Sequence, residues 1–213
     1  MSRRIPPIQN GERILIICEG YEENDYLSRL KGLNVWDSNF CIEIENAKSI
    51  DNIFAKYQYK YANGNYKLIL IFCDTEMNPY EQFVSLKNRI DAMHGNKASS
   101  KVLFFSNPCT MQIILSHFAK VSLRTNSKSG NSQLIERLVG VCDYRATENQ
   151  RVKLLKKVNR ENYYTMKDNL QGISDNYKVL PSTNVLELFE HLETYNKKWI
   201  ASVNKAIEKE TKS

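Results

Sequence analysis

Two long apolar runs of this chain each end on a carboxylate, and this pattern restricts the fold more than any other feature. Residues 14–18 read Ile-Leu-Ile-Ile-Cys and lead into Glu19 and Gly20, while residues 68–73 read Leu-Ile-Leu-Ile-Phe-Cys and lead into Asp74. An unbroken run of branched apolar residues is typical of a strand buried on both faces of a parallel sheet. Such a sheet presents its functional groups at the carboxyl ends of its strands. The two runs therefore predict that Glu19 and Asp74 lie at one edge of a sheet.

Strand-like runs alternate with segments of helical spacing over the first part of the chain. The runs cover residues 13–18, 40–45, 67–73 and 101–105, and the helical segments between them cover residues 21–33, 49–61 and 79–93. This alternation indicates right-handed crossovers and a parallel sheet with helices on both faces. Residues 1–120 are therefore predicted to form an α/β domain.

The C-terminal segment, residues 121–213, is expected to be a basic helical extension packed on that domain. Residues 122–132 are rich in Ser, Asn, Lys and Gly, which predicts a loop, and residues 133–172 are expected to be helical. Over residues 185–207, apolar side chains recur every three or four positions, which predicts one amphipathic helix that begins with a capping box at Asn184. Its apolar stripe is expected to pack against the domain.

The chain has 213 residues and a formal net charge of +6, and its positive charge is concentrated. Ten basic and three acidic residues lie between Lys120 and Arg160, a local net charge of +7. Such a segment suits a polyphosphate partner, because each neutralised phosphate releases counterions, although a solvated lysine-rich surface has the same composition. The residues expected to contact nucleic acid are Asn107, Arg124, Lys128, Arg145, Arg151, Lys153, Lys156, Lys157 and Arg160, with Tyr163 and Tyr164 as stacking surfaces for unpaired bases.

Cysteine usage and hydropathy exclude several classes of protein. The five cysteines are widely spaced and odd in number, so neither a disulfide framework nor a CxxC zinc site is expected. No stretch reaches the roughly 18 consecutive apolar residues that a membrane helix needs, and the N-terminus lacks the apolar core of a signal peptide. The protein is therefore expected in the reducing cytoplasm, with its thiols mostly buried and without a membrane partner.

Glu19, Asp74 and Glu76 are the candidate ligands of a metal ion. Neighbouring strands lie about 4.8 Å apart, so carboxylates at the ends of two such strands reach one ion. Mg²⁺, or Mn²⁺ in its place, prefers oxygen ligands and keeps several waters, so two or three carboxylates and a substrate phosphate suffice. Glu19 is expected to act as general acid or base or as a ligand, and the other two acids as ligands. The alternative is that these acids are helix caps or turn residues.

Three further residues have two interpretations each. Glu23 follows Glu19 by one helical turn and either reaches the same ion through water or interacts with the helix dipole. His117 either transfers a proton or is a half-buried, hydrogen-bonded histidine. Asn107 either donates to a phosphate or caps a helix that begins at Pro108. Glu23 and His117 are therefore candidate catalytic residues beside Glu19.

Segments of this chain resemble the RloB-like family of the Toprim superfamily, and the resemblance extends over most of the sequence. The segments are Ile16 to Gly20 with Glu23 and Tyr26, Phe105 to Cys109 with His117 and Phe118, and Leu180 to Val185. The resemblance implies a Toprim-like four-stranded parallel sheet of order 2-1-3-4 flanked by helices. It also implies Mg²⁺-dependent phosphodiester chemistry and a place in restriction and phage defence.

Three functions are compared. The first is a Mg²⁺-dependent Toprim-type nuclease that cleaves nucleic acid, RNA in the first place, in antiviral defence of the abortive-infection type, with a defence-system protein such as an ATPase as partner. The second is a catalytically degenerate Toprim module that binds nucleic acid or a partner protein, favoured by Glu22, Glu76 and Gln112, where the family has other residues. The third is a phospho-acceptor at Asp74, disfavoured because such sites have paired acids after the first strand. Metal binding separates the first function from the second.

Overall fold

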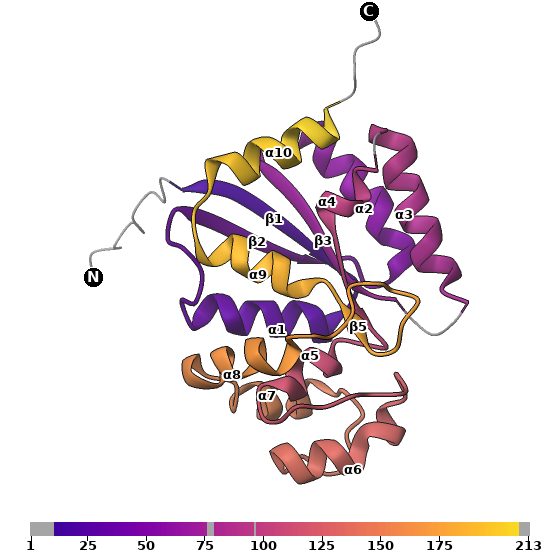
Figure 1. The fold of residues 1–213 in the computed structure, drawn as a ribbon, viewed down its shortest axis with the longest axis vertical. Coiled ribbons are helices and arrows are strands. Elements are labelled where there is room, and N and C mark those ends of the chain that lie inside the picture. Colours follow the sequence, from indigo (N-terminus) through magenta and orange to yellow (C-terminus); the bar gives the residue numbers. More distant parts are fainter. Residues whose placement is uncertain (1–10, 76–78, 96, 209–213) are drawn as a thin grey trace, which may run out of the picture.

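The central sheet has five strands in the order β2-β1-β3-β4-β5 (Figure 1). The computed structural model describes residues 11–75, 79–95 and 97–208. The parallel strands are β1 (Glu12–Cys18), β2 (Phe40–Asn46), β3 (Leu68–Asp74) and β4 (Leu103–Asn107). β1 pairs in parallel with both β2 and β3, and β3 pairs in parallel with β4. The α/β class and the order 2-1-3-4 predicted from the sequence are therefore confirmed.

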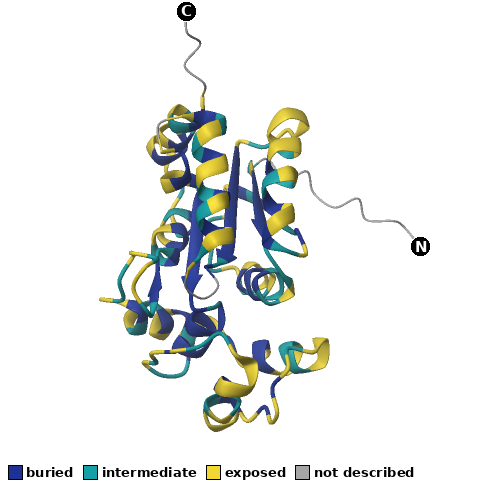
Figure 2. Cartoon of the chain, turned by 90° about the vertical axis from the view of Figure 1, so that its right-hand side faces the viewer, coloured by how far each residue is buried: buried dark blue, intermediate teal, exposed yellow. Residues whose placement is uncertain are grey.

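The helices between these strands cover both faces of the sheet. They are α1 (Tyr21–Gly32), α2 (Ile50–Asn63), α3 (Glu81–His94) and the single turn α4 (Ser99–Val102). α2 and α3 lie side by side on one face, and α1 lies on the other (Figure 1). Residues 14–18 of β1 are at most 1% exposed, and Figure 2 shows buried strands between helices whose outer faces are exposed. The fourth strand begins at Leu103 rather than at residue 101, because residues 99–102 form α4.

The C-terminal part of the chain is mainly helical, as predicted, but the stretch 133–172 is divided between three helices. Its helices are α5 (Met111–Ser116), α6 (Lys128–Val139), α7 (Glu148–Leu155), α8 (Arg160–Leu170), α9 (Val185–Glu193) and α10 (Lys197–Ile207). In Figure 1, α5 to α8 gather below the sheet and α10 lies at its opposite end. None of the helices in the described residues has both the length and the apolar character of a membrane span.

Two boundaries in this part differ from the prediction because polar side chains cap helices there. The single helix predicted over residues 185–207 is two helices, since the Asn196 side chain accepts two backbone N–H groups at 2.9 and 3.2 Å and starts α10. The loop predicted over residues 122–132 ends at Ser127, whose hydroxyl accepts the N–H of Gly130 over 3.1 Å and caps α6.

A fifth strand, β5 (Ser182–Thr183), pairs antiparallel with the end of β4 and was not predicted. Next to it, the N–H of Phe105 donates to Oδ1 of Asn184 over 2.8 Å, and Nδ2 of Asn184 donates to the carbonyl of Leu103 over 3.1 Å. Asn184 therefore extends the hydrogen bonding of β4 with its side chain. The capping box predicted at Asn184 is wrong, since this side chain makes no capping bond to α9.

Removing the Asn184 side chain is expected to destabilise the fold. Asn184→Ala leaves the Phe105 N–H and the Leu103 carbonyl without this partner, and an unsatisfied buried group costs about 1–3 kcal/mol. Urea denaturation followed by circular dichroism measures the free energy of unfolding. Asn149→Ala, at an exposed position of α7, is the control and should change that free energy by at most ~0.5 kcal/mol. Equal losses in the two variants would contradict the role of Asn184.

Candidate active site

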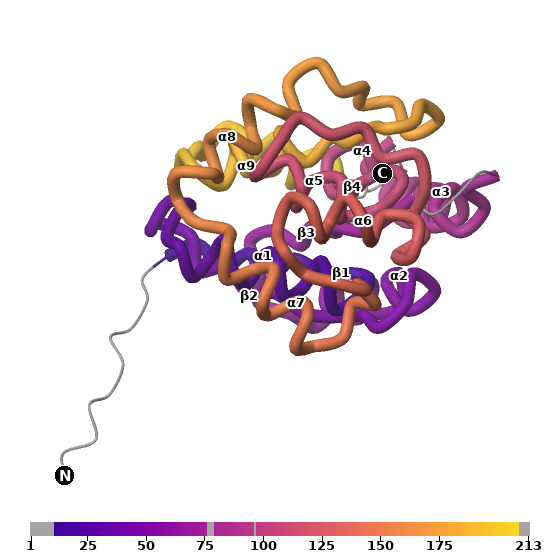
Figure 3. Tube along the Cα trace, turned by 90° about the horizontal axis from the view of Figure 1, so that it is seen from below, coloured from indigo at the N-terminus to yellow at the C-terminus, as the bar shows by residue number. Residues whose placement is uncertain are grey.

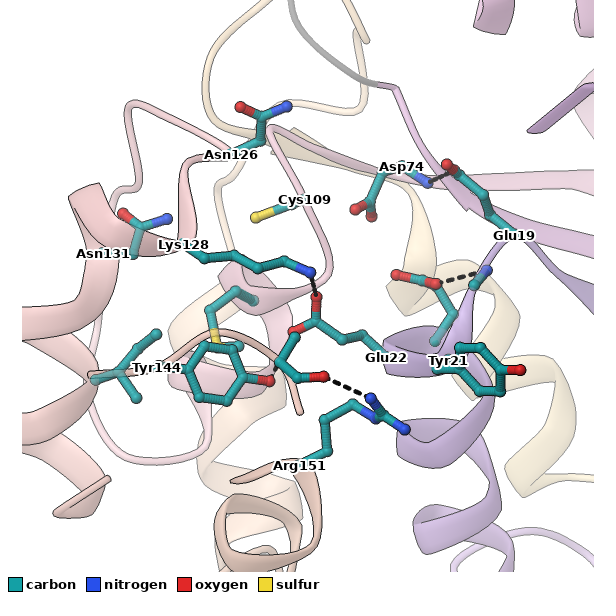
Figure 4. A pocket seen from close by; sticks show the side chains of 15 residues that line it. Glu19, Tyr21, Glu22, Asp74, Cys109, Asn126, Lys128, Asn131, Tyr144 and Arg151 are labelled. Carbon is teal, nitrogen blue, oxygen red and sulfur yellow. Dashed lines mark hydrogen bonds and ion pairs between the residues drawn. The ribbon is translucent and has the colours of Figure 1, made fainter. Parts of the chain in front are cut away.

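Glu19 and Asp74 lie side by side where two neighbouring strands end. Glu19 directly follows β1, and Asp74 is the last residue of β3. The backbone N–H of Asp74 donates to Oε2 of Glu19 over 3.1 Å (Figure 4). The structure therefore brings together the two carboxylates that the apolar runs predicted at one edge of the sheet. Glu76 lies outside the described residues.

Two further polar groups hold this cluster in place. The hydroxyl of Thr110, just before α5, donates to Oδ1 of Asp74 over 2.8 Å. Glu23, in the first turn of α1, is 5% exposed, and its Oε2 accepts the N–H of Gly20 over 2.9 Å. Both of the expectations for Glu23, at the acid cluster and at the helix start, are compatible with this position. Glu19, Glu23 and Asp74 line one cavity of about 310 Å³.

The opposite wall of this cavity comes from the segment that runs from α6 to α7. It includes Lys128 and Asn131 of α6, Tyr144 of the loop that follows, and Arg151 of α7 (Figure 4). Figure 3 views the molecule from the end at which these helices lie. The cavity therefore has an acidic wall built by the ends of β1 and β3 and the start of α1, and a wall with basic and amide groups built by the extension.

The carboxylates repel one another in this arrangement. Burial raises the pKa of Asp74 well above its usual value, the charges of Glu23 and Glu19 raise it further, and the hydrogen bond from Thr110 opposes them. Burial, followed by the charge of Glu22, likewise raises the pKa of Glu23. A cation placed between such groups would relieve the repulsion and favour their ionised forms.

The thiol of Cys109 also lines the cavity, but its environment does not favour nucleophilic chemistry. Burial, followed by the charge of Asp74, raises the pKa of Cys109 well above its usual value. The thiolate is the reactive form of cysteine, and here it is suppressed. No disulfide links the five cysteines, all of which lie in the described residues, and Cys142 is exposed rather than buried as expected.

The donor set of the acidic wall fits Mg²⁺. This ion takes carboxylate oxygens and usually binds through one or two carboxylates together with waters and substrate phosphates. Among residues 11–75, 79–95 and 97–208, no group of three or more His, Cys, Asp or Glu side chains is arranged to hold a metal ion. Glu19 and Asp74 therefore form an open pair of potential ligands and not a closed cage.

His117 lies outside this cavity and has a structural environment. It is 1% exposed; the Tyr26 hydroxyl is 2.9 Å from its Nε2, and Oδ1 of Asn162 is 3.0 Å from its Nδ1. Burial lowers the pKa of His117 to about 4, so the ring is neutral at pH 7. Both ring nitrogens are engaged in joining α1, α5 and α8. The expectation that His117 transfers a proton is therefore corrected in favour of the structural alternative.

Asn107 is fully buried as well and cannot contact nucleic acid. Its Nδ2 donates to the carbonyls of Tyr177 and Val179 over 2.8 and 2.9 Å. It is the last residue of β4, and α5 begins only at Met111, so the predicted helix cap is also wrong. The side chain instead fastens the segment that precedes β5 to the end of the sheet.

The structure divides the predicted nucleic-acid-binding residues into two groups. Lys128 and Arg151 line the cavity, and Lys156 lines a groove of about 590 Å³ between α1 and α7. Both cavity cations are paired with α1, since Nζ of Lys128 lies 3.0 Å from Oε2 of Glu22 and Nε of Arg151 lies 2.7 Å from Oδ2 of Asp25. The remaining basic residues are exposed and line neither space; these are Arg124, Arg145, Lys153, Lys157 and Arg160.

The aromatic surface beside the cavity is Tyr21, which the sequence analysis missed. Its side chain is 58% exposed, and the guanidinium of Arg151 lies 5.2 Å from the centre of its ring. Tyr21 and Arg151 border both the cavity and the groove, so the two spaces adjoin. Of the tyrosines predicted for stacking, Tyr163 is buried against Glu193 and only Tyr164 is exposed. The sequence signal that could have identified Tyr21 is its position directly after Glu19 and Gly20.

Comparisons with models of known protein families, with curated proteins and with solved structures found no match. The protein is therefore classified by its fold and its site alone. The protein has an α/β sheet of order 2-1-3-4 with a fifth antiparallel strand, and an open pair of carboxylates faces a partly basic wall at the carboxyl edge.

Asp74→Asn is expected to stabilise the protein at neutral pH. Because the pKa of Asp74 is raised above its usual 3.8 by folding, the folded state holds this proton more tightly than the unfolded chain. The free energy of unfolding therefore falls as the pH rises from 3.8 through the raised pKa, and asparagine removes this loss. Thermal melts in EDTA at about pH 8 should show a higher Tm for the variant, with about 2–4 °C gained per kcal/mol.

Asp168→Asn, at an exposed position of α8, is the control and should leave the pH dependence of Tm unchanged. Added Mg²⁺ should raise the Tm of the wild type more than that of Asp74→Asn. A variant that melts below the wild type near neutral pH would contradict the repulsion among these carboxylates.

Proposed function

We propose that this protein is a Mg²⁺-dependent nuclease of the Toprim type that hydrolyses phosphodiester bonds of nucleic acid, with RNA as the expected substrate. The observation that carries this proposal is the meeting of Glu19 and Asp74 between β1 and β3. At this point the strand order of the sheet reverses, and open α/β sheets bind their ligands at such a switch point. The basic groups across the cavity suit the phosphates of a strand.

In this mechanism each residue of the acidic wall has a separate role. Glu19 and Asp74 would hold a Mg²⁺ ion, and the Thr110 hydroxyl fixes the orientation of the Asp74 carboxylate. Such an ion would supply charge stabilisation at the scissile phosphate and a more acidic water. Glu23 is held by the Gly20 N–H, and its raised pKa suits proton transfer closer to neutral pH than an ordinary glutamate allows.

The substrate strand is proposed to leave the cavity along the groove between α1 and α7. Tyr21 offers an exposed ring to an unpaired base, and base–aromatic stacking does not depend on sequence. Lys156 lines the same groove and is placed to meet a phosphate. The basic residues outside the cavity and the groove contribute to the field that attracts the strand.

A cytoplasmic role in antiviral defence, together with a defence-system partner such as an ATPase, is part of the same proposal. It rests on the resemblance of the sequence segments around Glu19, Asn107 and Asn184 to the RloB-like family of the Toprim superfamily. Phage infection of cells that express the wild type or Asp74→Asn tests it. Protection that requires Asp74 would support the proposal, and equal plaque numbers in both strains would refute the defence role.

Glu19→Gln and Asp74→Asn should each lower the rate of Mg²⁺-dependent cleavage by about 100-fold or more, because each removes a carboxylate that holds the ion. The assay uses labelled single-stranded RNA, single-stranded DNA and their duplexes, with Mg²⁺, Mn²⁺ or EDTA. Circular dichroism checks the fold of each variant, and Asp168→Asn should retain the wild-type rate.

Cleavage by the double variant Glu19→Gln/Asp74→Asn at the wild-type rate would refute the assignment of these two residues. Binding of RNA or DNA by the wild type without cleavage in either metal would favour the non-catalytic module instead. The observation on the side of that alternative is that no three metal-binding side chains converge within the described part of the chain.

Lys156→Gln should weaken the binding of a single strand more than Lys153→Gln, although the two lysines are close in sequence. Lys156 lines the groove beside Tyr21, whereas Lys153 is exposed and lines neither the groove nor the cavity. Loss of one phosphate contact flattens the dependence of log K on log salt by about 0.7–0.9. Fluorescence anisotropy in EDTA at several salt concentrations measures this slope. Equal slopes for the two variants would show that the strand does not follow the groove.

A further inference from the structure

The carboxylate of Glu22 reaches the wall opposite the acid cluster. Its Oε2 lies 3.0 Å from Nζ of Lys128, and its Oε1 accepts the hydroxyl of Tyr144 over 2.8 Å (Figure 4). Glu22 belongs to α1, whereas Lys128 and Tyr144 belong to the extension. The contact therefore joins the two walls of the cavity through a single carboxylate.

Lys128 and Tyr144 together form a built site for an anionic oxygen. Tyr144 is only 1% exposed, so its hydroxyl is a fixed donor aimed into the cavity and not a mobile surface group. Burial, followed by the charge of Glu22, raises the pKa of Tyr144, so the hydroxyl keeps its proton. An ammonium and a hydroxyl can donate either to a carboxylate or to a phosphate oxygen. Such bonds to a charged oxygen are stronger than bonds between neutral groups.

The Glu22 carboxylate can be exchanged for another anion at little cost. The Lys128 side chain is 46% exposed, and ion pairs with an exposed partner contribute little net free energy. With Glu22 in place, four carboxylates and two cations line the cavity, and the excess negative charge repels a strand. The carboxylates are Glu19, Glu22, Glu23 and Asp74, and the cations are Lys128 and Arg151. Rotation of Glu22 away from the wall removes one carboxylate and frees two donors.

We propose that Lys128 and Tyr144 bind a phosphate of the nucleic-acid strand next to the scissile one, and that Glu22 fills this subsite until the strand displaces it. The inference rests on the proposed function and adds a phosphate subsite to it. A strand that also engages the groove displaces Glu22, whereas a single phosphate that lacks those contacts does not. Glu22 thereby lowers the affinity for short or weakly bound ligands.

The test is a double-mutant cycle on binding, with labelled oligo(U) and oligo(dT) as probes and fluorescence anisotropy in EDTA, where metal-dependent cleavage is absent. Glu22→Gln keeps the size of the side chain and an acceptor for Tyr144 but no longer pairs its charge with Lys128. It should bind the strands about fivefold or more tightly than the wild type, on the scale of coupling between contacting residues. Glu22→Gln/Lys128→Gln should gain clearly less over Lys128→Gln than Glu22→Gln gains over the wild type. Tyr144→Phe in the Glu22→Gln background should also lower the affinity.

Glu161→Gln makes the same change of charge at an exposed position of α8 and is the matched control. Equal gains for Glu22→Gln and Glu161→Gln would overturn the proposal, and so would a gain from Glu22→Gln that is as large without Lys128 as with it. Binding by the wild type with no gain for Glu22→Gln refutes the subsite and leaves the proposed function standing. Failure of every folded variant to bind any strand refutes the proposed function and the subsite together.

Discussion

The parallel pairing of β1 with β3 is the constraint on which the rest of this structure depends. Residues 14–18 of β1 and 68–73 of β3 are apolar and at most 5% exposed, so the two strands pack at the centre of the sheet with their carboxyl ends at one edge. Glu19 and Asp74 therefore lie at that edge, where burial makes the charge of Asp74 unfavourable. The hydrogen bond from the Thr110 hydroxyl compensates this cost in part. The cavity and its chemistry follow from where these two strands end.

The sheet could be predicted from the sequence because its strands carry their own signal. Unbroken apolar runs such as residues 14–18 identify a buried strand without knowledge of its neighbours. The deviations occur where a polar side chain decides the local structure. Asn196 caps α10 and so divides the predicted helix in two. Asn184 forms hydrogen bonds with the backbone of β4 and does not cap α9. β5 is too short for any periodic pattern, so only its partner strand reveals it.

The candidate site was predictable on one wall only. Its acids follow strands, whereas Tyr144 and Lys128 reach the cavity through contacts with Glu22 that cross more than a hundred residues of sequence and leave no local pattern. The same limitation explains why the functional roles predicted for His117 and Asn107 were wrong. Each is a polar residue at the end of an apolar run, and its partners lie on segments far away in the chain. Sequence alone could not distinguish such a buried structural side chain from a functional one.

The ion pairs between α1 and the extension change how ionic strength acts on this protein. Lys128 and Arg151 are already neutralised by Glu22 and Asp25, so neither starts from a fully solvated state when a phosphate arrives. A carboxylate that is displaced from its lysine or arginine takes up a cation from solution, which offsets the counterion released from the strand. A plot of binding against salt would then count fewer phosphates than the strand contacts. The salt dependence of binding would therefore underestimate the size of the interface between the protein and the strand.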